Sequence, residues 1–302
     1  MKRIWFAGLL GIALTAGANA AEKKILLIAG PPSHGPRQHE HNAGCLLLGG
    51  LLNTVPGIHA TVHTNGWPSD QSLFSGVDAV FLYCDGGGGH MAIQDNRLQT
   101  LSELMNKGVG FGCCHYAVEV PKEKGGQQWL DWMGGYFETD WSVNPHWTAD
   151  FKTIPKHPIT EGVKPFQMLD EWYFHMRFRE DMKGVTPILS AVPPADTMKR
   201  SDGAHSGNPA VRKAVAAGEL QHMMWTCERP NGGRGFGFTG GHFHDNWGND
   251  DFRRVVLNAV VWMAKGNIPA GGIQTVVTKE DLEKNLDPKG QLKPAPKAAK
   301  KK

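Results

Sequence analysis

The stretch Gly108-Val-Gly-Phe-Gly-Cys-Cys-His-Tyr-Ala117 is a short uncharged run that ends directly in reactive side chains. An amphipathic segment at 97–106 precedes it, so the pattern predicts a buried strand that follows a helix. The glycines permit close approach of neighbouring backbone and a sharp exit turn. In an open parallel sheet, ligands bind at the carboxyl ends of the strands. The exit is therefore a candidate functional edge. The alternative is that Cys113 and Cys114 fill the core and His115 is a hydrogen-bonded turn residue.

Apolar runs of strand length recur on both sides of this stretch. They lie at 24–29, 58–64, 77–84, 186–191, 221–227 and 235–239. Helical patterns alternate with the first of them, at 43–52 and 97–106, and a long apolar stripe at 252–263 follows the possible cap Asn249 and precedes Gly266. This alternation predicts an α/β fold with a mostly parallel, doubly wound sheet. The aromatic region 129–180 shows no clear period, and we expect an elaborated loop region that crosses the functional edge.

The two ends of the 302-residue chain are expected to lie outside the fold. Lys2 and Arg3, an apolar run and Ala18-Asn-Ala20 predict a signal peptide at 1–20, hence export to the periplasm or beyond. We expect a domain at 21–270 and a C-terminal extension at 271–302 with a disordered lysine-rich tail from Lys289. No other run is long and apolar enough to span a membrane. Without Lys2, Arg3 and the six tail lysines the net charge changes from +3 to −5, which argues against nucleic acid as a partner.

The five cysteines show no spacing that is typical of a zinc ribbon or a small disulfide scaffold. Their number is odd, so at least one thiol stays free, and adjacent cysteines rarely pair because the geometry is strained. We therefore interpret them as mostly buried apolar residues: Cys45, Cys84, Cys113, Cys114 and Cys227.

Titratable side chains follow four predicted strand ends, and a carboxylate pair lies in the aromatic region. The groups are His34/His39/His41, Asp85/His90, His115, His242/His244/Asp245 and Asp170-Glu171. Such a set is compatible with a divalent metal or with acid–base chemistry near neutral pH. In an extended segment, His39 and His41 would share one face, although a solvated polar loop is equally open. The candidate ligands are His39, His41, His115 and His242. This set of ligands does not distinguish zinc from a harder ion. The glycines at 86–89 lack the Lys-Ser/Thr of a phosphate loop, so no nucleotide cofactor is expected.

Five motifs, in order along 24–266, resemble the ThuA-like or trehalose utilisation family. They are Gly108–His115, His157-Pro-Ile-Thr-Glu-Gly162, Asp170-Glu-Trp-Tyr173, Gly235–His242 and Asn258-Ala-Val-Val-Trp262. The resemblance implies a flavodoxin-like three-layer fold related to class I glutamine amidotransferases. It also implies a role in carbohydrate catabolism, often beside enzymes that oxidise disaccharides at the 3-position, with His115, Asp170, Glu171 and His242 at shared polar positions. An amidotransferase would have Gly-x-Cys-x-Gly and His-x-Glu, whereas this chain has Gly112-Cys-Cys-His-Tyr116 and His242-Phe-His244, which argues against Cys114 as a nucleophile.

The first functional hypothesis is an exported lyase or hydrolase that cleaves or isomerises a 3-keto-glycoside. A ketone at C3 acidifies the C2 proton, which Glu171 or His115 would remove while His39, His41 and His242, with or without a metal, polarise the ketone. Candidate catalytic residues are His115, Asp170, Glu171 and His242. Candidate contacts to a small carbohydrate are His34, His90, Trp141, His146, Trp172, Tyr173, His244 and Asp245, with core packing as the alternative for each tryptophan. The other hypotheses are a non-catalytic sugar-binding protein and a Cys114-dependent amidase. The sequence leaves the oligomeric state open.

Overall fold

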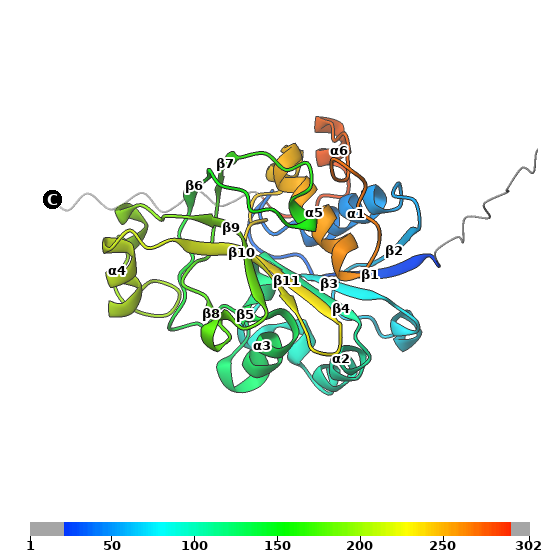
Figure 1. Ribbon diagram of the computed structural model, residues 1–302, viewed down its shortest axis with the longest axis horizontal. Coiled ribbons are helices and arrows are strands. Elements are labelled where there is room, and N and C mark those ends of the chain that lie inside the picture. The colour runs from blue at the N-terminus through cyan, green and yellow to red at the C-terminus, as the bar shows by residue number, and fades with distance from the viewer. Residues whose placement is uncertain (1–20, 291–302) are drawn as a thin grey trace, which may run out of the picture.

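The computed structural model describes residues 21–290, so the expected signal peptide at 1–20 and positions 291–302 of the lysine-rich tail lie outside the described residues. A seven-stranded sheet forms the centre of the molecule (Figure 1). Its strands are β1 (Lys23–Ala29), β2 (Ile58–His63), β3 (Ala79–Tyr83), β4 (Gly110–Cys114), β9 (Val185–Ala191), β10 (Gln221–Glu228) and β11 (Arg234–Phe238).

The strand order is β2-β1-β3-β4-β11-β10-β9. Every neighbouring pair from β2 to β11 is parallel, and β10 alone runs antiparallel to both of its neighbours. Short apolar runs with β-branched and aromatic residues suit strands that are covered on both faces. The predicted mostly parallel, doubly wound sheet is confirmed.

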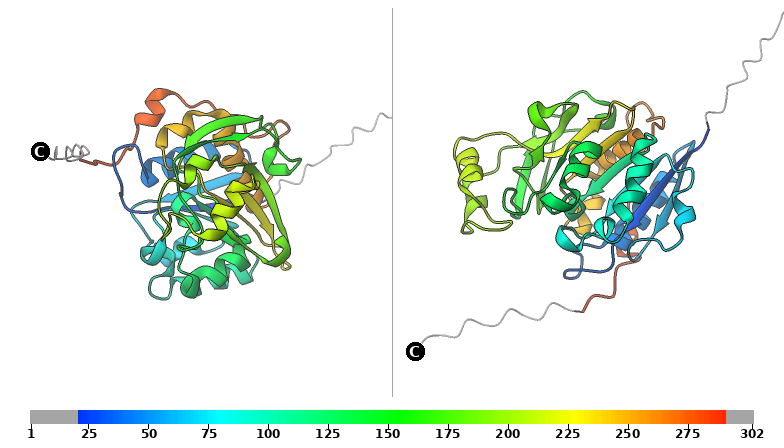
Figure 2. Two further views of the ribbon diagram at one scale, coloured as in Figure 1. Left: turned by 90° about the vertical axis from the view of Figure 1, so that its left-hand side faces the viewer. Right: turned by 90° about the horizontal axis from the view of Figure 1, so that it is seen from below.

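Helices cover both faces of the sheet, which gives three layers. Alternate residues of β1 point to opposite faces: Leu27 belongs to the core that includes α1 (His41–Leu52) and α5 (Asp250–Met263), whereas Leu26 belongs to the core under α2 (Arg97–Asn106) and α3 (Gln127–Met133). In Figure 2, the right-hand view shows α2 and α3 in front of the sheet. The flavodoxin-like three-layer fold that the family resemblance implied is confirmed.

Strand β4 packs so closely on both sides that its glycines cannot be replaced without displacement. A Cβ atom at Gly112 would lie 2.5 Å from the ring of Phe236, and one at Gly110 would collide with the carbonyl of Met263 at the end of α5. Gly108 has a φ of 80°, in the left-handed region. The close backbone approach predicted from this glycine pattern is thus present in the structure.

The aromatic region 129–180 has more regular structure than expected. It contains β5 (Gly135–Tyr136), β6 (Trp147–Phe151), β7 (Phe166–Asp170) and β8 (Arg177–Phe178), which form two antiparallel pairs, β5–β8 and β6–β7. Helix α4 (Pro209–Ala216), also unexpected, begins at the cap Asn208. Single turns of helix lie at Gln71–Phe74, Gly87–Gly89, Met91–Ile93, His115–Val118, Pro158–Thr160, Glu180–Met182, Ala195–Met198 and His244–Gly248, and a π-type turn at Lys122–Gly126.

Part of the C-terminal extension expected from residue 271 packs against the folded body. Asn258 of α5 accepts a hydrogen bond from the backbone of Ile273 (3.0 Å), and Arg253 donates to the carbonyl of Thr275 (2.8 Å). A short helix, α6 (Lys279–Glu283), follows. Lys289, expected in a solvated tail, is buried beside Glu40. The expected cap is confirmed: the side chain of Asn249 accepts from the first turn of α5.

Two further expectations concern membrane spans and cysteines. Within 21–290, the structure contains no helix that is both long and apolar enough to cross a bilayer. All five cysteines lie within the described residues, and each is free and buried, as expected.

Candidate metal centre at the carboxyl edge of the sheet

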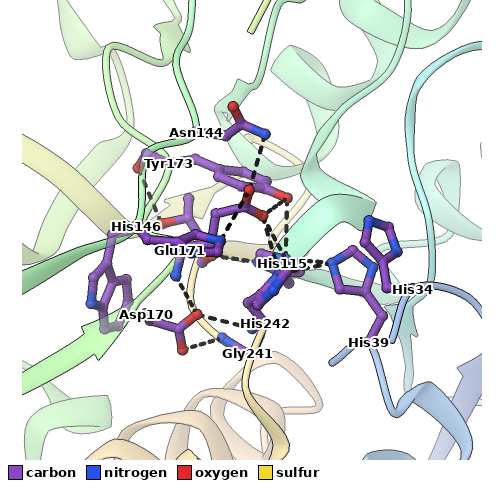
Figure 3. A network of polar contacts seen from close by, with 12 residues as sticks. His34, His39, His115, Asn144, His146, Asp170, Glu171, Tyr173, Gly241 and His242 are labelled. Carbon is purple, nitrogen blue, oxygen red and sulfur yellow. Dashed lines mark hydrogen bonds and ion pairs between the residues drawn. The ribbon is translucent and has the colours of Figure 1, made fainter. Parts of the chain in front are cut away.

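The loops that follow β1, β4 and β11 each bring a histidine to one place at the carboxyl edge of the sheet (Figure 3). Because these strands are parallel and lie in the central part of the strand order, their carboxyl ends share an edge. His39 comes from the first loop, His115 from the turn after β4, and His242 from the turn after β11. Glu171 joins them from the end of β7, in the aromatic region that we expected to cross this edge.

The four side chains present their ligand atoms within 4.8 Å of one another. His39 Nε2 lies 3.0 Å from His115 Nε2 and 3.1 Å from His242 Nδ1. Glu171 Oε2 lies 3.4 Å from His115 Nε2 and 3.2 Å from His242 Nδ1. Side chains of His39, His115 and His242 are nearly or fully buried, and that of Glu171 is 13% exposed.

The outer hydrogen bonds fix which ring nitrogen carries a proton. His39 Nδ1 lies 2.8 Å from a carboxylate oxygen of Asp85, and His115 Nδ1 lies 2.9 Å from the carbonyl oxygen of Thr239. Both partners only accept, so in the neutral rings each Nδ1 holds the hydrogen and each Nε2 holds a lone pair. Two lone pairs then face each other across 3.0 Å, an arrangement that needs a proton or a cation between them.

The local electrostatics favour the ligand forms of His39 and Glu171. Burial, followed by the neighbouring histidines, lowers the pKa of His39 far below its usual range, so this ring is neutral. Burial alone would raise the pKa of Glu171, but its contacts with the rings of His115, His146 and His242 outweigh burial and hold that pKa well below normal. A neutral imidazole beside an ionised carboxylate is what a metal requires of its ligands.

The donor set fits a divalent metal such as zinc. Metal–ligand bonds of about 2.0–2.1 Å in a tetrahedron place the ligand atoms roughly 3.3 Å apart. Four of the six distances between the ligand atoms, at 3.0–3.4 Å, match this value, and all six are within 4.8 Å. Imidazole and carboxylate are ligands that zinc accepts. The carboxylate of Asp85 behind His39 and the carbonyl behind His115 are the outer partners that metal-binding histidines commonly have.

His115 occupies a strained turn between β4 and the single helical turn that follows. Its φ is 54°, in the left-handed region that residues with a side chain rarely adopt. A sharp strand-to-helix turn of this kind presents the nucleophile in enzymes with a nucleophile elbow. Here the position with the positive φ belongs to a buried histidine. Cys114 lies one residue earlier, fully buried, with Sγ 3.5 Å from the carbonyl of Gly240, and burial raises its pKa well above normal.

Asp170 supports the turn that carries His242, a different place from the catalytic one expected. Its carboxylate accepts hydrogen bonds from the backbone of Gly241 (2.9 Å) and His242 (3.0 Å), and from the side chain of Asn246 (2.8 Å). The side chain is completely buried. Both carboxylate oxygens of Asp170 therefore stabilise the turn that follows β11.

Two adjoining hollows open onto Glu171, with volumes of about 410 and 280 Å³. Both are lined by Asn144, Glu171 and Arg200. His146, whose side chain is half exposed, lines the first, and its Nε2 lies 3.6 Å from Glu171 Oε1. The second is also lined by His34, His39, Tyr116, Tyr173, Ala204 and His205. The hydroxyl of Tyr173 lies 3.1 Å from His115 Nε2 and 3.2 Å from Glu171 Oε2.

Several residues expected at the site lie elsewhere. His41 is not in the four-residue cluster, because α1 begins at this residue and turns its ring to the carbonyl of Pro31. His90 caps a turn inside the core, and Trp172 is fully buried among Phe151, Phe238 and Phe252. Three more expected residues also lie outside the cluster. Trp141 stacks on His175, with the guanidinium of Arg177 over its ring. His244 is fully buried, and Asp245 pairs with Arg37.

Four residues at or behind the site were not among the candidate catalytic, substrate-binding or metal-binding residues, although Asp85 was counted among the titratable groups at strand ends. Asp85 orients His39, and Asn144 donates to Glu171 Oε1 at 3.2 Å. Arg200 donates to Asn144 Oδ1 at 2.8 Å, and His205 pairs with the buried Glu119. Only Asp85 had a visible signal, because it follows a predicted strand; the other three lie in irregular segments.

The sequence matches the family described as "Trehalose utilisation" (ThuA) over residues 35–263. The chain belongs to the ThuA family. Two solved structures have a similar fold. A ThuA-like protein from Bacteroides uniformis ATCC 8492 is 14% identical, with a TM-score of 0.55 over 83% of this chain and 96% of that one. A ThuA-like protein from Parabacteroides merdae ATCC 43184 is 16% identical, with a TM-score of 0.53 over 85% and 94%. None of the curated proteins compared with the chain matches it.

Proposed function

We propose that this ThuA-family protein is a metal-dependent enzyme that acts on a carbohydrate by acid–base chemistry. His39, His115, His242 and Glu171 would hold the metal. The observation that carries the proposal is the close approach of His39 Nε2 and His115 Nε2 at 3.0 Å, while the Nδ1 atom of each ring faces an outer acceptor. A bound divalent cation would supply electrophilic polarisation of a substrate oxygen.

The substrate class we propose is a 3-keto-glycoside. A ketone at C3 makes the proton on C2 acidic. When a base takes that proton and the glycosidic oxygen leaves C1, a C1=C2 double bond forms, and the departing oxygen accepts a proton. The reaction therefore needs one base and one acid close to the group that binds the ketone.

The proton carriers would be groups beside the ligand set. The hydroxyl of Tyr173 and the ring of His146 both face Glu171 and line the two hollows. If no metal binds, Glu171 and His115 themselves take these roles, since they contact each other at 3.4 Å. The polar lining, with Asn144, Arg200 and His205, suits the hydroxyl groups of a sugar better than an apolar ligand.

The test is to purify the protein, measure its bound metal, and incubate it with 3-keto-trehalose and related 3-keto-glycosides. We expect about one zinc or similar ion per chain, sugar release that EDTA abolishes, and recovery on adding the metal back. Turnover that is indifferent to EDTA would move the chemistry to Glu171 and His115. Binding of these sugars without turnover would favour a non-catalytic sugar-binding protein.

The burial and raised pKa of Cys114 argue against an amidase that uses this thiol. Export to the periplasm or beyond remains part of the proposal, and its support is the charge and apolar pattern of residues 1–20.

A further inference from the structure

The last described segment of the chain contacts the loop that carries His39. We call residues 279–290 the C-terminal strap and residues 33–40 the ligand loop. The strap lies beyond the part of the chain that matches the ThuA family, which ends at residue 263. It begins with α6 and reaches the ligand loop through Glu283, Asp287 and Lys289.

The centre of this contact is a buried ion pair. The side chains of Lys289 and Glu40 are 6% and 1% exposed, and Lys289 Nζ lies 3.2 Å from Glu40 Oε1. The same ammonium group donates to the carbonyl of His39 at 3.2 Å and to that of Gln38. Glu40 Oε2 accepts from the backbone of Asp287 at 2.9 Å. One lysine of the strap thus binds three successive residues, and the middle one, His39, is the metal-ligand candidate.

The ligand loop has a backbone that needs such support. His34, Arg37 and His39 have φ angles of 58°, 63° and 45°, in the left-handed region that residues with a Cβ rarely adopt. Such conformations persist only where the surroundings determine them. Arg37 is held by Glu283 of the strap at 2.8 Å and by Asp245, and its backbone donates to Glu40 Oε1 at 2.8 Å.

Other contacts set the direction of the His39 side chain once its backbone is in place. The His39 amide donates to the carbonyl of His242 at 3.0 Å, and its ring stacks on His34 with centroids 3.5 Å apart. A carboxylate oxygen of Asp85 contacts Nδ1 of the His39 ring. The strap therefore fixes the backbone, and the sheet edge fixes the ring.

We propose that the C-terminal strap is a positioning element that holds His39 at the metal centre, so that metal affinity depends on residues outside the family region. This inference rests on the proposed metal centre. A purely structural strap, which only covers α1 and the turn His244–Gly248, would change the stability of the protein without a specific effect on metal affinity.

The experiment compares zinc affinity, measured by competition with a chromogenic chelator, in the full-length wild type and two variants. Lys289→Met removes the ammonium group from the ligand loop and keeps a chain of similar length. Lys284→Met is the matched control, because Lys284 is exposed and pairs only with Asp281. Loss of an outer support typically weakens metal binding by roughly 10–100-fold, which we expect for Lys289→Met and not for Lys284→Met.

A second variant guards against misfolding, since Lys289→Met leaves Glu40 buried without its partner. Glu40→Gln combined with Lys289→Met removes both charges, and we expect the same loss of zinc affinity. The wild type alone provides an independent readout. If the strap tightens metal binding, zinc must by reciprocity tighten the strap, and the amide of Asp287 should exchange more slowly with zinc bound.

The outcomes separate the two proposals. A wild type that binds no zinc contradicts the proposed function itself. A wild type that binds zinc, with unchanged affinity in both Lys289 variants and no effect of zinc on the exchange of residues 283–289, would overturn the positioning role and leave the metal centre intact.

Discussion

Asp85 offers the sharpest test of the proposed centre, because it contacts the outer nitrogen of His39 and lies outside the cluster of His39, His115, Glu171 and His242. The carboxylate can only accept, so it keeps the hydrogen on Nδ1 and the lone pair on Nε2. Asp85→Asn preserves shape and removes this restriction. An amide can donate to Nδ1, which would place the hydrogen on Nε2, where it blocks the metal.

The expected effect is a 10–100-fold loss of zinc affinity, or about 1.4–2.7 kcal/mol of binding free energy. Chelator competition at constant pH measures this directly, and Asp95→Asn is the matched control, since Asp95 is 73% exposed and pairs with Arg97 away from the site. Zinc affinity of Asp85→Asn within twofold of the wild type would refute the tautomer argument, because the lone pair on His39 would then not depend on its partner.

Glu171→Gln removes the single carboxylate of the cluster, so we expect zinc affinity to fall more than about tenfold and turnover of a 3-keto-glycoside to be lost; full turnover would remove Glu171 from the mechanism. Gly112→Ala places a Cβ 2.5 Å from the Phe236 ring and should destabilise the protein by about 1–3 kcal/mol in urea unfolding, whereas Gly89→Ala, with open space around it, should not. Burial raises the pKa of Cys113 and Cys114, so in the folded protein they should resist iodoacetamide at pH 8 and react once urea is added; rapid labelling of the native protein would contradict their burial. Because unfolded thiols ionise near pH 8.5 and these buried ones do not, the stability that they contribute is present below that pH and should be lost progressively as the pH rises above it, which unfolding at pH 7 and pH 10 would measure.

The sheet could be predicted from the sequence because buried parallel strands leave a strong local signal. The runs at 24–29 and 77–84 are apolar on both faces, and each ends in glycine or polar residues. The pair β6–β7 was missed although Trp147–Phe151 alternates buried and exposed positions, because aromatic residues on all sides hid the period. Helix α4 was missed despite a visible start signal, Asn208 before Pro209.

The part of the site that depends on the order of the strands could be predicted from the sequence. His115 and His242 follow neighbouring parallel strands, so their meeting follows from strand order. The expectation for His41 depended on an extended backbone, whereas a helix begins there; the His41 ring lies near that of His39, with centroids 5.4 Å apart, but outside the cluster. Glu171 was predicted as a base, and its place in the ligand cluster depends on β7, a strand that left no clear signal. The order of residues 271–290 depends on polar contacts over long sequence distances, which no local pattern reports.

The contact between the strap and the ligand loop also bears on when the site forms during synthesis. Glu40 and Asp287 are 247 residues apart. His39 leaves the ribosome well before the residues of the strap that hold its loop, so the part of the chain around His39 emerges without them. Closing so long a loop is entropically late compared with the pairing of neighbouring strands. With the proposed positioning role of the strap, the histidine cluster reaches its final geometry only after the strap has joined the folded body, and a metal ion would bind at that stage.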